Sequence, residues 1–342
     1  MHHRTSVLLA VAVAFTAACS GTPTPPSDAG QANATTNHPT GTAATMTGGD
    51  APGPTTAAAS SPSIAAGDPT AAVSTAAELQ LPRGGTTIFP AHRLVGYSGY
   101  PGSPALGRLG VGDLDERVTE IEKLGAEYAA GRTVLPVLEL IATVVHSRPG
   151  ADGLYRTRID DDVVARHLEA ARRHRAILLL NIQPGRARFL DEVEHWARWL
   201  REPDVGLALD PEWAVGPGQV PGKVFGRSSG AELDEIAEFL SGIVATHRLP
   251  EKVLLYHQLH ASIVREPAAL QPHPGVALVV SVDGIGNRAE KTSTWTRIVS
   301  LTPAHVHKGF KLFYDEDTRR GPLMTPAQVL QLSPQPEYVL YE

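Results

Sequence analysis

The stretch from Val205 to Trp213 reads VGLALDPEW, an apolar run that ends in two carboxylates, Asp210 and Glu212. Side chains of a strand repeat every two residues, so both acids should project to one side, with their Cα atoms roughly 6 to 7 Å apart. Such a pair can cleave a glycosidic bond, because one acid protonates the leaving oxygen and the other stabilises positive charge on the sugar. The alternative is a surface pair that caps the next helix or meets an arginine.

Eight apolar runs recur along residues 87–342, which is close to the usual length of one eight-fold α/β barrel. Near-continuous apolar runs are typical of strands covered on both faces, and helical patterns such as Asp113–Tyr128 and Asp161–Arg173 separate many of them. The sequence therefore predicts an α/β fold, a (β/α)8 TIM-like barrel, with an open doubly wound sheet as the competing architecture. The runs are Leu94–Ser98, Val134–Leu140, Ile177–Ile182, Val205–Leu209, Val253–Tyr256, Val276–Val282, Phe310–Tyr314 and Tyr338–Tyr341.

Polar and aromatic side chains follow these runs, and barrel enzymes place their chemistry at the C-terminal ends of the strands. Carboxylates and amides bind hydroxyl groups, and aromatic rings stack on sugar faces, so the set suits a glycan or another polyhydroxylated ligand. The substrate-binding candidates are Tyr97, Glu139, Asn181, Gln183, Trp213, His257, Gln258, Asp283 and Tyr341.

The residues GLALDPE from Gly206 to Glu212 resemble the signature Asp-Gly-x-Asp-x-Asp-x-Glu, which ends the fourth barrel strand in chitinase-type, family 18 glycoside hydrolases. The resemblance implies that Glu212 is the catalytic acid and that Asp210 orients an N-acetyl group and stabilises an oxazolinium intermediate. The residues LFYD at 312–315 resemble the Met-x-Tyr-Asp of that family, which implies catalytic roles for Tyr314 and Asp315. A conventional mechanism that pairs Glu212 with another carboxylate, Asp315, Asp283 or Glu139, stays open.

Two other functions are compatible with the same residues. Val205 and Ala208 stand where the family has its first two acids, so the chain could be a barrel that binds carbohydrate without cleaving it. A metal-dependent hydrolase could use Asp210, His257 and Asp283. However, no third ligand follows the histidine pairs at a recognisable spacing, so we expect neither a metal nor another cofactor.

Charge and composition limit the partners of the chain. The formal net charge is −6 and the charges are interspersed, so there is no basic stripe for nucleic acid, and we expect no nucleic-acid partner. We expect the protein to be a monomer.

Residues 1–18 have the pattern of a secretory signal peptide, with a polar, basic start and an apolar run that is too short to span a bilayer. Small residues then precede Cys19, the only cysteine of the chain. This junction resembles the lipobox of bacterial, actinobacterial-type lipoproteins. The resemblance implies that Cys19 carries acyl chains such as palmitate and holds the protein on the extracytoplasmic face of the cell membrane.

Residues 19–86 consist mainly of Ala, Thr, Pro, Ser and Gly, with almost no large apolar side chain. Such a segment cannot bury enough apolar surface to offset the loss of chain entropy on folding. We therefore expect a disordered tether between the lipid and the barrel domain.

Overall fold

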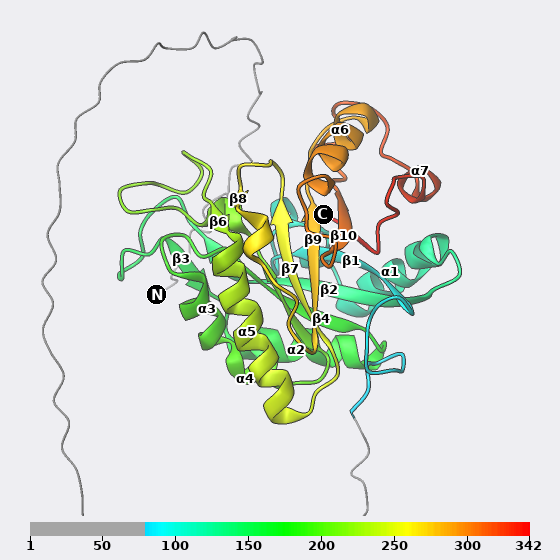
Figure 1. Ribbon diagram of the computed structural model, residues 1–342, viewed down its shortest axis with the longest axis horizontal. Helices are drawn as coiled ribbons and strands as arrows, with labels where there is room; N and C mark the ends of the chain where they lie inside the picture. Colours follow the sequence, from blue (N-terminus) through cyan, green and yellow to red (C-terminus); the bar gives the residue numbers. More distant parts are fainter. Residues whose placement is uncertain (1–78) are drawn as a thin grey trace, which may run out of the picture. The chain divides into compact units, whose positions relative to one another are not determined.

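A computed structural model describes residues 79–342, in which eight parallel strands close into a barrel with helices around it (Figure 1). The first strand, β1, pairs with β2 on one side and with the last strand, β11, on the other. This closure confirms the TIM-like barrel, because an open doubly wound sheet would leave two strands with an unpaired edge. The barrel strands are β1 (His92–Gly99), β2 (Thr133–Val145), β4 (Ile177–Ile182), β5 (Val205–Leu209), β7 (Lys252–Gln258), β9 (Val276–Val282), β10 (His307–Leu312) and β11 (Tyr338–Tyr341). Cys19, the predicted signal peptide and most of the predicted tether lie outside the described residues.

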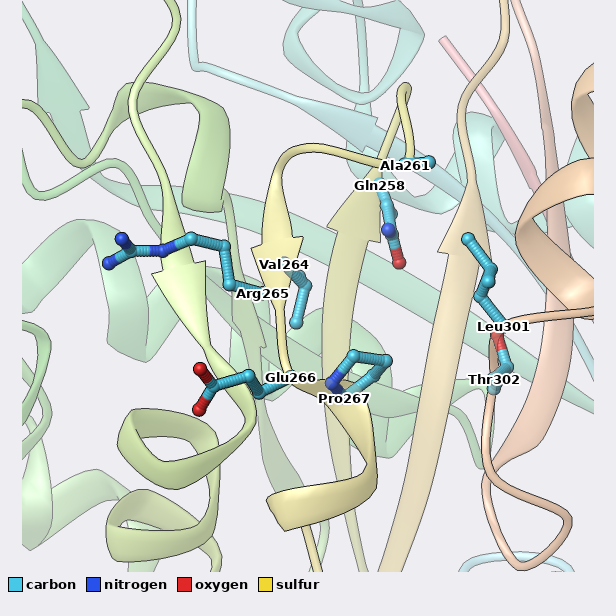
Figure 2. A pocket seen from close by; sticks show the side chains of 8 residues that line it. All are labelled: Gln258, Ala261, Val264, Arg265, Glu266, Pro267, Leu301 and Thr302. Atoms are coloured by element: carbon cyan, nitrogen blue, oxygen red, sulfur yellow. The ribbon is translucent and has the colours of Figure 1, made fainter. Parts of the chain in front are cut away.

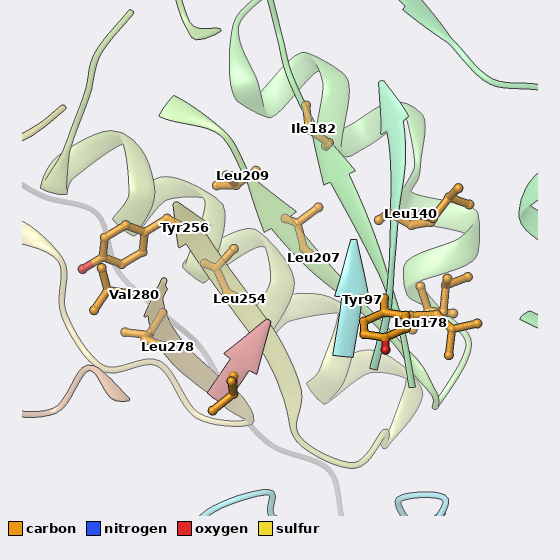
Figure 3. Packing of buried hydrophobic residues seen from close by; sticks show 14 of the residues in the cluster. Tyr97, Leu140, Leu178, Ile182, Leu207, Leu209, Leu254, Tyr256, Leu278 and Val280 are labelled. Atoms are coloured by element: carbon orange, nitrogen blue, oxygen red, sulfur yellow. The ribbon is translucent and has the colours of Figure 1, made fainter. Parts of the chain in front are cut away.

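The strands are apolar on both faces because one face lines the barrel interior and the other packs under the helices. Leu94, Leu179 and Leu255 belong to the interior cluster. Their neighbours along the strands, such as Leu178 and Tyr256, belong to the outer cluster, part of which Figure 3 shows. This strict alternation decides which residue at each strand end can reach the interior.

The helices connect successive strands, and capping side chains fix where several of them begin. Asp113 accepts hydrogen bonds from the first turn of α1, and Ser229 caps α5. Asn287 and Glu290 form a capping box at α6. The helices are α1 (Leu114–Tyr128), α2 (Asp161–Arg173), α3 (Phe189–His195), α4 (Ala197–Leu200), α5 (Gly230–His247), α6 (Arg288–Val299) and α7 (Pro326–Leu330).

Short strands and 3-10 turns lie at the C-terminal end of the barrel. β2 continues beyond the barrel and pairs with the antiparallel strand β3 (Arg156–Arg158), and β6 (Ser228–Ser229) pairs with β8 (Val264–Arg265). Single 3-10 turns are η1 (Pro104–Leu106), η2 (Arg108–Gly110), η3 (Pro211–Trp213) and η4 (Pro267–Ala269). The connection between β7 and β9 contains only β8 and η4.

Residues before β1 close the opposite end of the barrel. Leu81 and Ile88 are buried in the interior cluster and line a small cavity with Ile177 and Val253, near the N-terminal ends of β4 and β7. Arg83 donates a hydrogen bond of 2.5 Å to Glu122. Among the described residues, packing therefore begins at Leu81, within the range 19–86 that composition assigned to the tether. Among the residues described, no helix is both long and apolar enough to cross a bilayer.

Candidate active site

Charged and amide side chains fill the barrel interior at the C-terminal ends of the strands. We call this group the polar layer. Most members lie at inward positions near or just beyond the C-terminal ends of their strands, above the apolar interior cluster, and nearly all are buried; Tyr338, the first residue of β11, belongs to the interior cluster and reaches the layer with its hydroxyl. Since an unpaired buried charge is costly, such a layer must be held together by internal ion pairs and hydrogen bonds. Its members are Glu139, Asn181, Gln183, Asp210, His257, Asp283, Lys311, Tyr338 and Glu342.

His257 is the centre of the polar layer and has no exposed surface. Its Nδ1 lies 2.6 Å from Asp283 Oδ2, and its Nε2 lies 2.8 Å from Glu139 Oε1 and 3.6 Å from Asp210 Oδ1. Burial alone would lower the pKa of His257, but the surrounding carboxylates outweigh it and raise the pKa well above its usual value. His257 is therefore an imidazolium that donates both of its N–H groups to carboxylates.

Lys311 supplies the second buried cation. Its Nζ lies 2.6 Å from Glu342 Oε2 and 3.5 Å from Asp283 Oδ2. Burial disfavours the ammonium form, yet the carboxylates nearby outweigh it, and the pKa of Lys311 is raised well above its usual value. The pKa of Asp283, which faces both cations, falls to about 2 although burial opposes that shift.

Asp210 is held by two amide side chains from the neighbouring strand β4 and its end. Asn181 Nδ2 donates to Asp210 Oδ1 over 3.1 Å, and Gln183 Nε2 donates to Oδ2 over 3.0 Å. The same Asn181 nitrogen also donates to Glu139 Oε1 over 3.0 Å. Both oxygens of Asp210 thus accept hydrogen bonds, which favours its ionised form, although burial and the charge of Glu139 raise its pKa.

Glu212 lies in η3, two residues beyond Asp210, and is half-buried. Its Oε2 atom is buried and has no hydrogen-bond partner. Burial, and after it the charge of Asp210, raises the pKa of Glu212 well above its usual value. Asn181 Oδ1 is likewise buried without a partner. Two unsatisfied polar atoms therefore flank Asp210, and unsatisfied buried groups of this kind are rare and call for an explanation.

The structure brings five predicted substrate-binding residues into the polar layer: Glu139, Asn181, Gln183, His257 and Asp283. It also shows that Glu139 and His257 have no exposed surface, so neither can touch a substrate in this state. Their side chains bind each other rather than a ligand.

Three predicted tyrosines lie outside the polar layer, because their positions on the strands point outward. Tyr97 and Tyr341 are buried in the outer cluster, and the Tyr341 hydroxyl lies 2.6 Å from that of Tyr128 on α1. Tyr314 packs against the outer cluster, and its hydroxyl lies 3.3 Å from that of Tyr97. Packing under α1 is therefore their visible role, and none of the three reaches the acids of the interior.

Gln258 also points outward, next to the inward His257. It lines a hollow of about 290 Å³ between the connection that follows β7 and the residues after α6 (Figure 2). Its amide donates to His260 O over 3.3 Å. Asp315 is exposed in the turn after β10, whereas Trp213 is half-buried beside Glu212 in η3. Trp213 follows Glu212 directly in the sequence and stays a predicted substrate contact.

Two members of the polar layer, Lys311 and Tyr338, were missed by reasoning from the sequence. Tyr338 O–H donates to Glu139 Oε2 over 2.8 Å. Both residues lie within apolar runs, where they resemble core residues rather than site residues. A signal was available for Lys311, because a lysine inside a buried strand needs a carboxylate partner and shares its face with the other inward residues.

The side chains of the metal-dependent alternative are present together, but His257 is not free to bind a cation. Both of its nitrogens are within hydrogen-bond distance of carboxylates, and an imidazolium has no lone pair to offer a metal. In the part of the chain that the structure describes, no group of three His, Cys, Asp or Glu side chains is arranged to hold a metal ion.

No protein-family model and no curated protein matches the sequence.

Proposed function

We propose that this protein hydrolyses glycosidic bonds, with Glu212 as the general acid and Asp210 as the carboxylate that stabilises the developing positive charge on the sugar. The observation that carries the proposal is the Glu212 carboxyl group, which has an oxygen buried without a partner and lies two residues from Asp210. A general acid must keep its proton near the working pH, and burial next to a like charge is how proteins achieve this.

Asp210 and Glu212 hold a proton with different affinity because their surroundings differ. Asp210 accepts two amide hydrogen bonds and lies 3.6 Å from the His257 imidazolium, whereas Glu212 Oε2 accepts none. The pair titrates as a coupled unit, and the first proton to leave should come from Asp210. In the state with one proton, Asp210 is the anion and Glu212 is the acid.

The reaction then proceeds by proton transfer within that state. Glu212 gives its proton to the glycosidic oxygen, the bond from that oxygen to the anomeric carbon breaks with its electron pair going to the oxygen, and Asp210 faces the resulting positive charge. Water afterwards adds to the anomeric carbon and loses a proton to Glu212, which restores the acid. The chemistry needs no group beyond these two carboxyls, the glycan and water.

Asp210 suits the second role better than the other carboxylates do. Glu139 and Asp283 each accept a hydrogen bond from His257, so their charges are already compensated. Asp315 is exposed and lies in a turn outside the polar layer. Asp210 directly follows β5 and Glu212 lies two residues on in η3, close enough for the charge of Asp210 to raise the pKa of Glu212, so these two acids are the pair best placed to act on one bond.

The Glu212→Gln variant tests this proposal. It keeps the shape of the side chain but removes the transferable proton, so turnover should fall by roughly 100-fold or more while oligosaccharide binding stays close to that of the wild type. Product release and binding should be followed separately with fragments of cell-envelope glycans. Glu235→Gln, on the exposed side of α5, is the matched control and should keep full turnover.

Two outcomes would count against hydrolysis. Binding without product by the wild type would favour a carbohydrate-binding barrel, and the absence of both over a broad panel would remove the glycan from consideration.

We further propose that Cys19 is lipidated and holds the domain outside the cell membrane, which rests on the signal and lipobox pattern of the sequence. Detergent partitioning of the full chain with and without the Cys19 thiol tests that attachment, and equal partitioning would contradict it.

A further inference from the structure

The proposed chemistry uses neither of the two buried cations, His257 and Lys311. Together they nevertheless contact the four carboxylates of the polar layer. His257 has no exposed surface, so it is not a contact for substrate. Only about a tenth of the Lys311 side chain is exposed, and its ammonium group is committed to Glu342 and Asp283. Placing two cations inside a barrel is costly unless they neutralise charges that the protein needs there.

The cations and the carboxylates form one connected chain across the barrel interior. Glu342, which accepts a hydrogen bond of 2.8 Å from Ser98, contacts Lys311, and Lys311 contacts Asp283. From there the contacts run through His257 to Glu139 and Asp210. Amides and hydroxyls complete the set, with Asn181 and Gln183 on Asp210, Ser281 on Asp283, and Tyr338 on Glu139.

We propose that His257 and Lys311 are positioning residues that keep Asp210 ionised and in place, so that the one proton of the Asp210–Glu212 pair stays on Glu212. The inference rests on the proposed function for its catalytic meaning, but its physical content is the charge state of the layer. Without Glu212, four carboxylates, Glu139, Asp210, Asp283 and Glu342, face two cations. The layer thus already holds two more negative charges than positive ones, and removing one cation raises that excess to three, which favours the uptake of a proton by one of the carboxylates.

A purely structural role for the two cations makes a different prediction. If they only fill space and hold strands together, their loss should lower stability, or lower turnover equally at every pH. If they set the charge of Asp210, every carboxyl of the layer should ionise at a higher pH once a cation is gone. Both limbs of the pH profile should then move upward, because the rising limb reports Asp210 and the falling limb reports Glu212.

The experiment compares His257→Gln and Lys311→Met with the wild type in the full chain. The infrared carboxylic-acid band is titrated and assigned to Glu212 by its loss in Glu212→Gln, and turnover of glycan fragments is measured over the same pH range. We expect both readouts to shift upward by about one to three pH units, the usual effect of one opposite charge at close range. Unshifted titrations in a folded variant would overturn the proposal.

Lys252→Met is the matched control. Lys252 is a buried lysine on the same strand as His257, at the opposite end of β7, where its ammonium group donates to Glu202 O and Val205 O over 2.6 and 2.7 Å. Burial lowers the pKa of Lys252 to about 7, so its loss removes a buried amine that is charged below neutral pH and lies outside the polar layer. We expect the pH profile to stay in place, whatever the change in stability.

A measurement on the wild type tests the proposal even if neither variant folds. The ¹⁵N chemical shifts of His257 should show a doubly protonated imidazolium at mildly alkaline pH, and a neutral ring would overturn the proposal. The failure of hydrolysis is distinguishable from the failure of this inference. A wild type without turnover, whose Glu212 titration nonetheless shifts in His257→Gln, would exclude hydrolysis while keeping the positioning role.

Discussion

Glu212 places a carboxyl oxygen inside the protein with no hydrogen-bond partner, and this arrangement affects stability as well as chemistry. Its pKa in the folded state lies well above the value in the unfolded chain, so the folded protein binds a proton that the unfolded chain releases. A group with a raised acid pKa therefore makes folding less favourable as the pH climbs. A carboxyl group held protonated in this way lowers the free energy of unfolding at higher pH.

Glu212→Gln should for this reason stabilise the protein at neutral pH. Below the pKa of the unfolded glutamate, near 4.5, both forms carry a proton and the substitution gains nothing from linkage. Between that pH and the raised folded pKa, wild-type stability declines and the variant is spared the decline. Urea denaturation of both proteins at several pH values measures this, and a stability difference that does not grow with pH would refute it.

Which residues join the site was only partly predictable at the scale of single side chains. Glu139 was found because it lies at the end of an apolar run, and Asp210 and Asp283 because each directly follows one. Tyr97 and Gln258 were predicted to lie with these acids, but they occupy outward positions of their strands. The prediction rested on closeness to the strand end, whereas the alternation of side chains between the two faces decides which residues point inward. The pairing of His257 with two carboxylates could not be predicted, since it depends on the register of strands far apart in the sequence.

At the scale of elements, the apolar runs located every barrel strand because sheets covered on both faces have few polar residues. Differences arose where a neighbouring element intervenes. β2 extends to Val145 because β3 pairs with its end, and the helical residues between 189 and 200 divide at Trp196 into α3 and α4. Neither feature leaves a clear periodic signal in a single sequence.

Two glycines illustrate how position within an element decides the effect of a substitution. A Cβ added to Gly206, on β5, would lie 2.9 Å from Val253 O, so the close approach of β5 and β7 needs a glycine there. Gly242, in the exposed part of α5, has nothing near its added Cβ. We expect Gly206→Ala to destabilise by about 1–3 kcal/mol and Gly242→Ala to stabilise by about 0.5–1 kcal/mol, as urea denaturation can measure. Equal effects would contradict the tight packing inferred at β5.

At the scale of the whole molecule, the short segment before β1 decides where the folded domain begins. Leu81 is 3% exposed, and Arg83 bonds Glu122 and the carbonyl of His174. A chain beginning at residue 79 keeps these contacts, and one beginning at residue 87 loses them. We expect the shorter chain to be less stable by about 2 kcal/mol or more from the burial of Leu81 alone.

The comparison of these two truncations is made by urea denaturation at one pH. Leu81→Ala in the longer chain is the control that separates the leucine from the loss of Arg83. Equal midpoints for the two truncated chains would show that the domain begins after residue 86, as composition alone suggested.

The same segment gives the barrel a direction. The chain enters at the N-terminal ends of the strands, where Leu81 and Ile88 lie, whereas Asp210 and Glu212 follow the C-terminal end of β5. The described chain thus begins at one pole of the barrel and carries its acids at the other. An attachment made through the first described residues, such as the lipid proposed for Cys19, would therefore join the domain at the pole that lacks the acids.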